Sequence, residues 1–256
     1  MEINEAIKLL EEAKSCGISA LDFDYQQIKY GIPEEVKNSQ MKVNSVYAFM
    51  DFTQDGAFEE AKKFVDFVKN LGAIAMPVPE KPSAEEVAEL KNAKTKDEIF
   101  AQLQKLPAAV KTAEALNALS RYGKSIGVPV CVENFDSHRS LTERMYELEW
   151  LFMKAPDLGF NLDTGNSITC GEDIMDLYND FAERIVNVHC KDRTAENKTT
   201  AVGTGKMPIA EIKNRLLSAA AKDARKKASV LCEAMDVKIC FCFFLFHECK
   251  VCKTCK

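Results

Sequence analysis

Short apolar runs alternate with longer amphipathic stretches along the chain, and this alternation limits the folds open to it. The amphipathic stretches place apolar residues three and four positions apart, which is the period of a helix with one buried face. The apolar runs are nearly continuous, as in strands buried on both faces of a parallel sheet. Seven runs have this character: residues 18–25, 42–52, 73–79, 128–133, 158–163, 185–189 and 229–233. The pattern therefore predicts an α/β protein whose parallel sheet is covered by helices.

Helices are predicted between these runs, with ends marked by glycine and proline. The first helix carries its apolar residues on one side and stops before Gly17. One long helix, or two helices joined near Pro107, leads to Gly127. Residues 80–95 form either a solvated connection or a surface helix. Further helices are predicted over residues 33–39, 58–72, 141–155, 170–184 and 208–228.

The length of 256 residues suits one TIM-type (β/α) barrel, which typically needs roughly 250 residues and eight strands. The chain opens on a helix and only seven strands are predicted, so we expect the first strand to be missing. After Glu233 the expected last helix gives way to a segment rich in cysteine and phenylalanine. We therefore predict an α/β fold of the TIM-barrel type over residues 1–235, incomplete because it lacks its first strand and last helix. An open doubly wound sheet of seven strands is the structural alternative.

Residues 236–256 form an atypical C-terminal tail rich in cysteine and phenylalanine. The spacing Cys249-x-x-Cys252-x-x-Cys255 is one that can bind zinc. The composition changes abruptly after Met235, as it would after translation in a wrong frame or at a damaged gene end. We interpret the segment as an appended tail, with a structural zinc site and a genuine but unusual C-terminus as the alternatives.

Charge and hydropathy argue against several classes of partner. The formal net charge of −5 does not indicate the basic face that binds nucleic acid. The longest apolar run is far shorter than the roughly 20 residues that cross a bilayer. The N-terminal sequence MEINEAIKLLEEAK lacks the basic and apolar regions of a signal peptide. We expect a cytoplasmic protein that binds neither nucleic acid nor a membrane, and a homo-oligomer stays an open alternative.

Each of the last four predicted strands ends on a side chain that can bind a divalent metal ion: Glu133, Asp163, His189 and Glu233. The C-terminal ends of parallel barrel strands converge on one face, where barrel enzymes have their active sites. Three carboxylates gathered there would repel one another without a cation. Three oxygens and one nitrogen suit a site for one divalent ion, with Mn²⁺ as the first choice and Mg²⁺, Co²⁺ or Zn²⁺ as alternatives.

Five short motifs surround these residues: VCVENF with Glu133, NLDTGN with Asp163, NVHCKDR with His189, VGTGKM at 202–207 and VLCE with Glu233. As a set they resemble the xylose-isomerase-like barrels, which include sugar-phosphate isomerases, ketose 3-epimerases, inosose dehydratases and endonuclease IV repair enzymes. The resemblance covers roughly residues 1–233. It implies that the four strand-end residues bind one divalent ion, and that Glu133 and Glu233 also act as acid and base.

The resemblance implies a reaction and a set of residues that meet the substrate. The predicted activity is a metal-dependent isomerase or epimerase of a sugar or sugar phosphate, with proton transfer next to a carbonyl through a metal-stabilised enediolate. Asn166 stands where many family members carry a histidine that contacts the substrate. Independently of the resemblance, Lys191 and Arg193 follow His189 by two and four residues, and a strand would place Lys191 on the same side as His189. Both are candidates for binding a substrate oxygen or phosphate, with solvated loop charges as the alternative. The alternatives are an inosose-type dehydratase with the same ion and a truncated barrel without catalytic activity.

Overall fold

The computed structural model describes residues 3–79, 84–137, 140–207, 209–210 and 212. Its first half contains α1 (Ile3–Ser15), β1 (Ala20–Asp24), α2 (Tyr25–Ile28), α3 (Glu34–Ser39), β2 (Lys42–Met50), α4 (Ala57–Leu71), β3 (Ile74–Pro79), α5 (Ala84–Asn92), α6 (Lys96–Lys105) and α7 (Pro107–Ile126). Its second half contains β4 (Cys131–Glu133), α8 (Met145–Lys154), β5 (Gly159–Asp163), α9 (Thr164–Cys170), α10 (Ile174–Phe181), the 3₁₀ helix η1 (Ala182–Arg184), β6 (Ile185–His189), β7 (Asp192–Arg193) and β8 (Thr199–Thr200).

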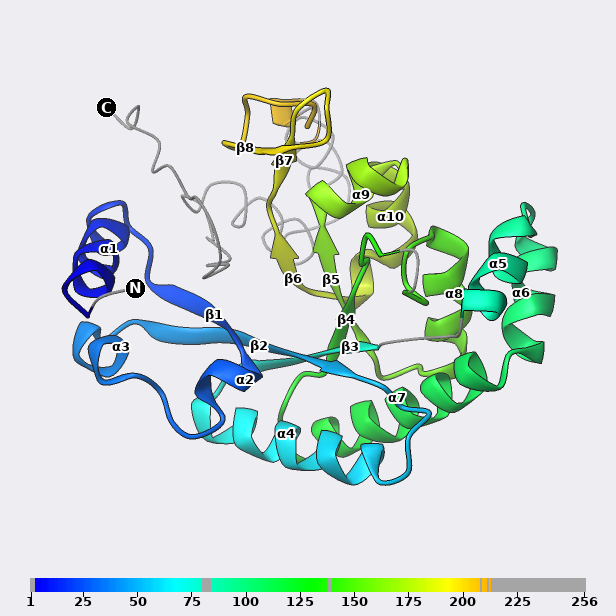
Figure 1. Cartoon of the computed structure of the whole chain (residues 1–256), viewed down its shortest axis with the longest axis horizontal. Helices are drawn as coiled ribbons and strands as arrows, with labels where there is room; N and C mark the ends of the chain where they lie inside the picture. The colour runs from blue at the N-terminus through cyan, green and yellow to red at the C-terminus, as the bar shows by residue number, and fades with distance from the viewer. Residues whose placement is uncertain (1–2, 80–83, 138–139, 208, 211, 213–256) are drawn as a thin grey trace.

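Strands β1 to β6 form a parallel array in which the spatial order follows the chain order (Figure 1). The array consists of two three-stranded sheets, β1-β2-β3 and β4-β5-β6. A parallel bridge between Ala75 and Val130 joins them, and the Ala75 amide donates to the Pro129 carbonyl at 2.9 Å. Within the described residues the array does not close into a barrel. The predicted TIM-type α/β architecture is confirmed for these six strands, and the predicted strand 229–233 lies outside the described residues.

Helices α4 and α7 cover the outer face of the array (Figure 1). Helix α4 buries Phe64, Val65 and Val68 completely, which explains its strict apolar stripe. It ends at Gly72, whose φ of 64° suits glycine and whose amide bonds back to the Lys69 carbonyl. Most buried apolar side chains of both halves of the array belong to one continuous cluster, and a second, smaller cluster joins α1, β1 and α3. The helices therefore hold the strands from outside and leave the strand ends free to carry polar groups.

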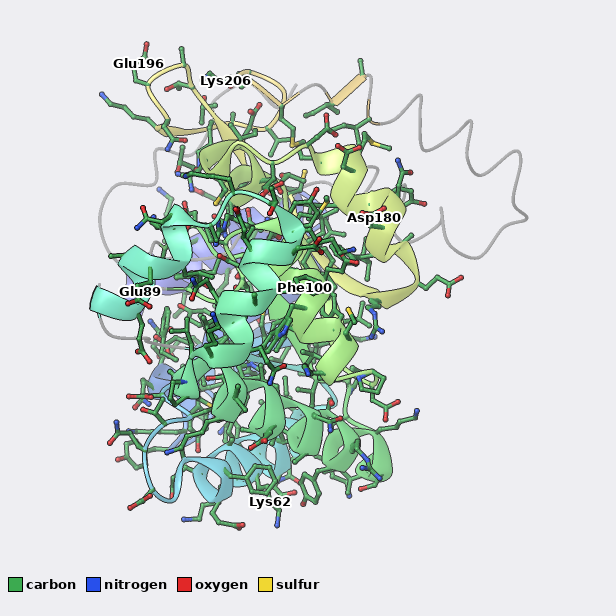
Figure 2. All side chains as sticks on the ribbon, turned by 90° about the vertical axis from the view of Figure 1, so that its right-hand side faces the viewer. Lys62, Glu89, Phe100, Asp180, Glu196 and Lys206 are labelled. Carbon is green, nitrogen blue, oxygen red and sulfur yellow. The ribbon has the colours of Figure 1, made fainter. Side chains whose placement is uncertain are left out.

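Proline 107 divides the long helical segment into α6 and α7, which decides between the two alternatives drawn from the sequence. Proline has no amide hydrogen to donate, and it favours an extended residue before it, as Leu106 is. Residues 84–92 of the ambiguous segment form the helix α5. Figure 2, which looks toward α5 and α6, shows Lys62 of α4 at one end of the molecule and Glu196 and Lys206 at the other.

Three local predictions were wrong. Residues 170–184 do not form one helix, because Gly171 (φ 73°) ends α9 and the Asp173 side chain caps a new helix, α10. Tyr25 was assigned to a strand but begins α2, because Asp24 accepts a hydrogen bond from the Gln26 amide and caps this turn. The predicted helix 141–155 begins only at Met145. In addition, the hairpin of β7 and β8 was not predicted.

No helix among the described residues is long and apolar enough to span a bilayer. The predicted helix 208–228 lies almost wholly outside the described residues, and the C-terminal tail 236–256 lies wholly outside them.

Candidate metal centre

Three of the four predicted metal ligands meet at the C-terminal ends of neighbouring strands. Glu133 is the last residue of β4, Asp163 of β5 and His189 of β6. Asp163 pairs with His189 in the sheet, and all three side chains are buried. One ligating atom from each lies within 4.8 Å of the other two. Glu233, the fourth predicted ligand, lies outside the described residues.

One nitrogen of the histidine ring faces both carboxylates of the cluster. His189 Nδ1 lies 3.1 Å from Glu133 Oε1 and 3.7 Å from Asp163 Oδ2. The Lys191 ammonium also enters the cluster, with its Nζ 2.5 Å from Asp163 Oδ2 and 3.7 Å from Glu133 Oε1. Because side chains alternate along an extended chain, Lys191 lies on the same side as His189, as the sequence predicts. The chain thus supplies a positive charge of its own between the two carboxylates.

Asp163 is fixed by its neighbours so that one oxygen faces the cluster. Its Oδ1 accepts the Asn166 amide at 2.9 Å, which caps α9. Its Oδ2 is buried and accepts no hydrogen bond of good geometry among the described residues, although the Lys191 ammonium lies beside it. The side chain of Asn134 ties the end of β4 to β5, since it accepts the Asp163 amide at 2.7 Å and donates to the Asp163 carbonyl at 2.9 Å.

The two carboxylates of the cluster differ in acidity. Burial raises the pKa of Glu133 to about 7, and the negative charge of Asp163 adds to this effect. Burial also opposes ionisation of Asp163, but the charge of the Lys191 ammonium and the polar groups of Glu133 and His189 beside the carboxylate outweigh this effect. The pKa of Asp163 therefore lies well below its usual range. Asp163 is a permanent anion in this arrangement, whereas Glu133 can hold a proton near neutrality.

Asp22 of β1 is a member of the site that the sequence reasoning missed. Its Oδ2 lies 3.3 Å from His189 Nε2, on the side of the ring away from Glu133. Burial would raise the pKa of Asp22, but the hydrogen bond and charge of His189, with hydrogen bonds from Asn44 and Ser45, lower it. The available signal was a charged residue between two apolar ones, Leu21 and Phe23, inside a predicted strand.

The residues present fit a divalent cation. Two carboxylates and an imidazole are the donor set of Mn²⁺, Mg²⁺, Co²⁺ and Zn²⁺ sites. Two ligands about 2.2 Å from one ion can be up to about 4.4 Å apart. The distances from His189 to Glu133 and Asp163, 3.1 and 3.7 Å, are within that limit. The buried Asp163 Oδ2, which lacks a well-directed hydrogen bond, is the kind of atom that an ion would satisfy.

The other predicted substrate-binding residues lie at different distances from the cluster. Asn166 is buried within it and donates to Glu133 Oε1 at 3.2 Å. Arg193 faces the hairpin, where it lies 3.3 Å from Asp136 Oδ2 and donates to Thr199 Oγ1 at 3.1 Å. The structure therefore brings Asn166 and Lys191 to the candidate ligands and directs Arg193 toward the neighbouring loop.

Asp192 organises the glycine-containing segment 203–207, which belongs to the VGTGKM motif and forms a turn. Its buried carboxylate accepts the amides of Gly203 and Gly205 through Oδ2, at 3.0 and 2.9 Å. It also accepts the amides of Arg193 and Met207 through Oδ1, both at 2.8 Å. A Cβ at Gly205 would lie only 2.3 Å from the Arg193 carbonyl oxygen, so this close approach requires glycine. The segment beside the site is therefore held by one carboxylate.

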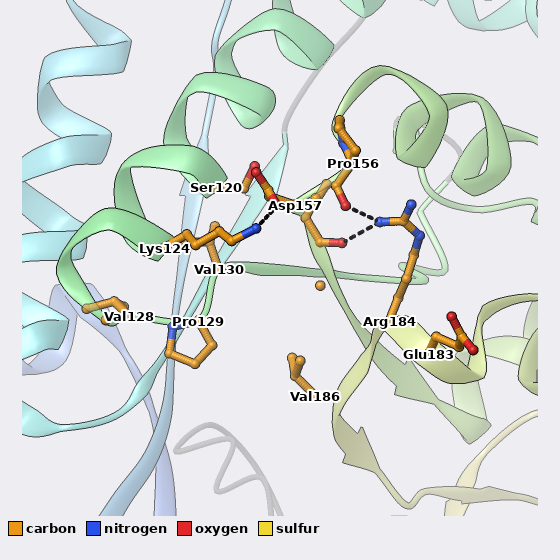
Figure 3. Close-up of a pocket in the computed structure, with 13 residues that line it drawn as sticks. Ser120, Lys124, Val128, Pro129, Val130, Pro156, Asp157, Glu183, Arg184 and Val186 are labelled. Atoms are coloured by element: carbon orange, nitrogen blue, oxygen red, sulfur yellow. Dashed lines mark hydrogen bonds and ion pairs between the residues drawn. The ribbon is translucent and has the colours of Figure 1, made fainter. Parts of the chain in front are cut away.

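A cavity of about 440 Å³ lies at the opposite end of these strands, where β4, β5 and β6 begin (Figure 3). The charged side chains at its rim are already engaged, since Lys124 pairs with Asp157 and Arg184 donates to the Pro156 carbonyl at 2.8 Å. Barrel enzymes carry their chemistry at the C-terminal ends of strands. The candidate functional site is therefore the cluster of Glu133, Asp163 and His189 and not this cavity.

No family model matches the chain, and no curated protein matches it in sequence. Solved structures do match it. The probable 3-DHS dehydratase AsbF of Bacillus anthracis superposes with a TM-score of 0.60 at 11% identity, over 93% of each chain. A sugar phosphate isomerase/epimerase from Parabacteroides distasonis gives 0.58 at 15% identity, over 91% of this chain and 87% of the other. The IOLI protein with a bound zinc atom gives 0.58 at 16% identity, over 81% and 78%. The chain therefore has the fold of the xylose-isomerase-like TIM barrels.

Proposed function

We propose that this protein is a divalent-metal-dependent isomerase or epimerase of a sugar or sugar phosphate. The observation that supports this most is the buried cluster of Glu133, Asp163 and His189 at three adjacent strand ends. The cluster occurs in a fold shared with a sugar phosphate isomerase/epimerase and a zinc-binding protein. A buried group of titratable side chains with a perturbed pKa at this face of a barrel is a functional-site candidate on physical grounds.

Glu133, Asp163 and His189 would hold the ion, with Glu233 as the fourth ligand. We propose Mn²⁺ as the ion, with Mg²⁺, Co²⁺ or Zn²⁺ as alternatives. When bound, it supplies positive charge that polarises a substrate carbonyl and stabilises negative charge beside it. Asn166 orients both carboxylates, since its backbone amide donates to Asp163 Oδ1 and its side chain donates to Glu133 Oε1, while Asn134 holds the backbone of Asp163 against the end of β4.

The chain's own side chains would move the proton. One of Glu133 and Glu233 takes it from the carbon next to the carbonyl, and the other returns a proton to the neighbouring carbon or the opposite face. Lys191 binds a substrate oxygen or phosphate, because its ammonium already lies within the cluster. Asn166 donates a hydrogen bond to a substrate hydroxyl, a role that its amide can fill without titrating. Arg193 stays a proposed phosphate-binding residue, and to act as one it would have to leave its contacts with Asp136 and Thr199.

The test is incorporation of solvent deuterium at the α-carbon of ketoses and their phosphates in the presence of Mn²⁺. The Glu133→Gln and Glu233→Gln variants should each lower the exchange rate about 10²–10⁴-fold, since each removes a proton-transfer group. Glu60→Gln, on the exposed side of α4, is the matched control and should exchange at the wild-type rate. Persistence of exchange in either site variant would show that the acid and base are assigned wrongly.

A dehydratase acting on a polyhydroxy ketone is the second candidate. It is favoured by the superposition on a probable dehydratase over 93% of both chains. Such an enzyme would use the same α-proton removal and then expel a hydroxyl group from the β-carbon. The two activities separate in one experiment, because loss of water creates a conjugated ketone with new ultraviolet absorbance, whereas isomerisation and epimerisation conserve the substrate formula.

A further inference from the structure

Asp22 and the candidate metal ligands lie on opposite edges of the His189 ring. Nε2 is 3.3 Å from Asp22 Oδ2, and Nδ1 is 3.1 Å from Glu133 Oε1. The side chains of Asp22 and His189 are almost completely buried, at 1% and 4% exposure. The two ring nitrogens therefore have different partners in a site from which bulk water is largely excluded.

The orientation of the Asp22 carboxylate is set by β2. Its Oδ1 accepts three hydrogen bonds, from Asn44 Nδ2 at 2.8 Å, from the Ser45 amide at 2.9 Å and from Ser45 Oγ at 2.8 Å. Three donors on one oxygen leave little freedom to rotate the group. Oδ2 is consequently directed at the histidine and Oδ1 at the second strand.

A histidine that ligates a metal through one nitrogen must have that nitrogen unprotonated, so its single ring proton resides on the other. We propose that Asp22 is a positioning residue that keeps this proton on Nε2 of His189 and so presents Nδ1 to the divalent ion. The proposal rests on the metal-dependent function proposed above. It adds a residue of β1 to a site whose described ligands come from β4, β5 and β6. Asn161 Nδ2 lies 3.0 Å from Nδ1, and with the proton on Nε2 it would donate to Nδ1 in the metal-free protein.

The three hydrogen bonds to Oδ1 make an Asp22→Asn substitution informative. The amide oxygen of asparagine should remain opposite Asn44 and Ser45, because all three groups there are donors. Its NH₂ group then faces His189 Nε2 and needs an acceptor, which moves the ring proton to Nδ1. Removal of such a partner typically lowers metal affinity 10–100-fold, and a misplaced proton should lower it at least that much.

The matched control is Ser45→Ala. It removes one of the three donors to Oδ1 from the same buried layer but leaves Oδ2 facing the ring. Its affinity for Zn²⁺, measured by competition with a chromophoric chelator, should stay within about threefold of wild type. Circular dichroism and thermal melts of both variants report whether the fold is retained.

Nitrogen NMR of the full chain loaded with diamagnetic Zn²⁺ shows directly which ring nitrogen of His189 carries the proton. The sequence has only three histidines, and His138→Gln with His247→Gln leaves His189 as the single labelled ring. We expect a proton on Nε2 and the metal-shifted resonance on Nδ1. Because this spectrum needs no change at Asp22, it can overturn the proposal even where Asp22→Asn does not fold.

The outcomes distinguish the proposed metal-dependent function from the proposed role of Asp22. A wild-type chain that binds no Zn²⁺ would contradict the proposed function itself. A wild-type chain that binds Zn²⁺ through Nε2, or an Asp22→Asn variant that folds and binds as tightly as wild type, would overturn the role of Asp22 alone. Weakened binding in Asp22→Asn with unchanged binding in Ser45→Ala, together with a proton on Nε2, supports it.

Discussion

At the scale of single residues, Lys191 places an ammonium group beside both carboxylates that would hold the divalent ion. Opposite charges in a buried site stabilise each other, so the lysine relieves the repulsion between Glu133 and Asp163 in the metal-free protein. The same charge opposes a second cation. At about 4 Å and an effective dielectric constant of about 20, even two single charges repel by about 4 kcal/mol. The lysine therefore has to withdraw, or weaken its hold on Asp163, when an ion binds.

Lys191→Met tests this competition. The variant should bind Mn²⁺ at least about tenfold more tightly than wild type, since 1.4 kcal/mol of relieved repulsion is sufficient for that factor. Without metal it should melt at a lower temperature, because the two carboxylates lose their counter-ion. Titration calorimetry and thermal melts measure both effects. Lys198→Met, on the exposed turn of the hairpin, serves as the control. Equal or weaker Mn²⁺ binding in Lys191→Met would refute the competition.

The candidate ligands could be found from the sequence because each ends an apolar strand, and parallel strands bring their C-terminal ends together. This rule can be applied without knowing which strands face each other across the interior. Asp22 could not be found in this way, since its role depends on β1 facing β6 through the interior, which no local pattern encodes. Arg193 was grouped with Lys191 by sequence spacing, but the hairpin draws its side chain toward Asp136.

At the scale of elements, the connection after β6 depends on one buried carboxylate. Asp192 accepts four backbone amides, from Arg193, Gly203, Gly205 and Met207. Hydrogen bonds to a charged group contribute about 1.5–3 kcal/mol each, and unsatisfied buried donors are costly. The hairpin and the segment 203–207 should therefore form and open together as one unit.

Asp192→Ala should destabilise the protein by at least about 3 kcal/mol, because it leaves several amides without an acceptor. Hydrogen exchange should accelerate most at the amides of Gly203, Gly205 and Met207. The amides in α4 and β2 should keep the same order of exchange rates as in wild type. Urea unfolding and exchange measured by mass spectrometry check the two effects. Thr204→Ala, in the same segment but exposed, should change stability by less than about 0.5 kcal/mol. Unchanged exchange in Asp192→Ala would show that other contacts hold the segment.

The sequence predicted the described strands and long helices well because their apolar periods extend over many residues. The prediction failed where one or two residues determine the boundary of an element. Gly171 and Asp173 divide a continuous helical pattern into two helices, and Asp24 converts the end of a strand into a turn of helix. The β7–β8 hairpin joins strands of two residues each, too short to show any alternation.

At the scale of the whole molecule, polar side chains link the two halves of the parallel array through its interior. Asn44 of β2 donates to Asn187 of β6 at 3.3 Å, and Asp22 of β1 meets His189 of β6. Within the described residues, the backbone joins the halves only beside β3 and β4, through the bridge of Ala75 and Val130. These interior contacts therefore help to fix the position of β1 relative to β6. A ligand bound by His189 would affect the same relative position.

A divalent ion should consequently stabilise the molecule as a whole. An ion that binds only the folded chain, at 100 times its dissociation constant, adds about 2.7 kcal/mol to the free energy of unfolding. For a chain of this size each kcal/mol raises Tm by about 2–4 °C, so saturating Mn²⁺ should raise it by about 5–11 °C.

The increment should disappear in Asp163→Asn, which weakens the ligand set at the end of β5, and should persist in Glu60→Gln on the outer face of α4. Differential scanning calorimetry with Mn²⁺ and with a chelator measures it. The ion is held by side chains from three strands, so its contribution is lost only when those strand ends separate. A Tm that is the same with and without Mn²⁺ would mean that the folded chain holds no ion, which would favour the barrel without catalytic activity over the enzyme.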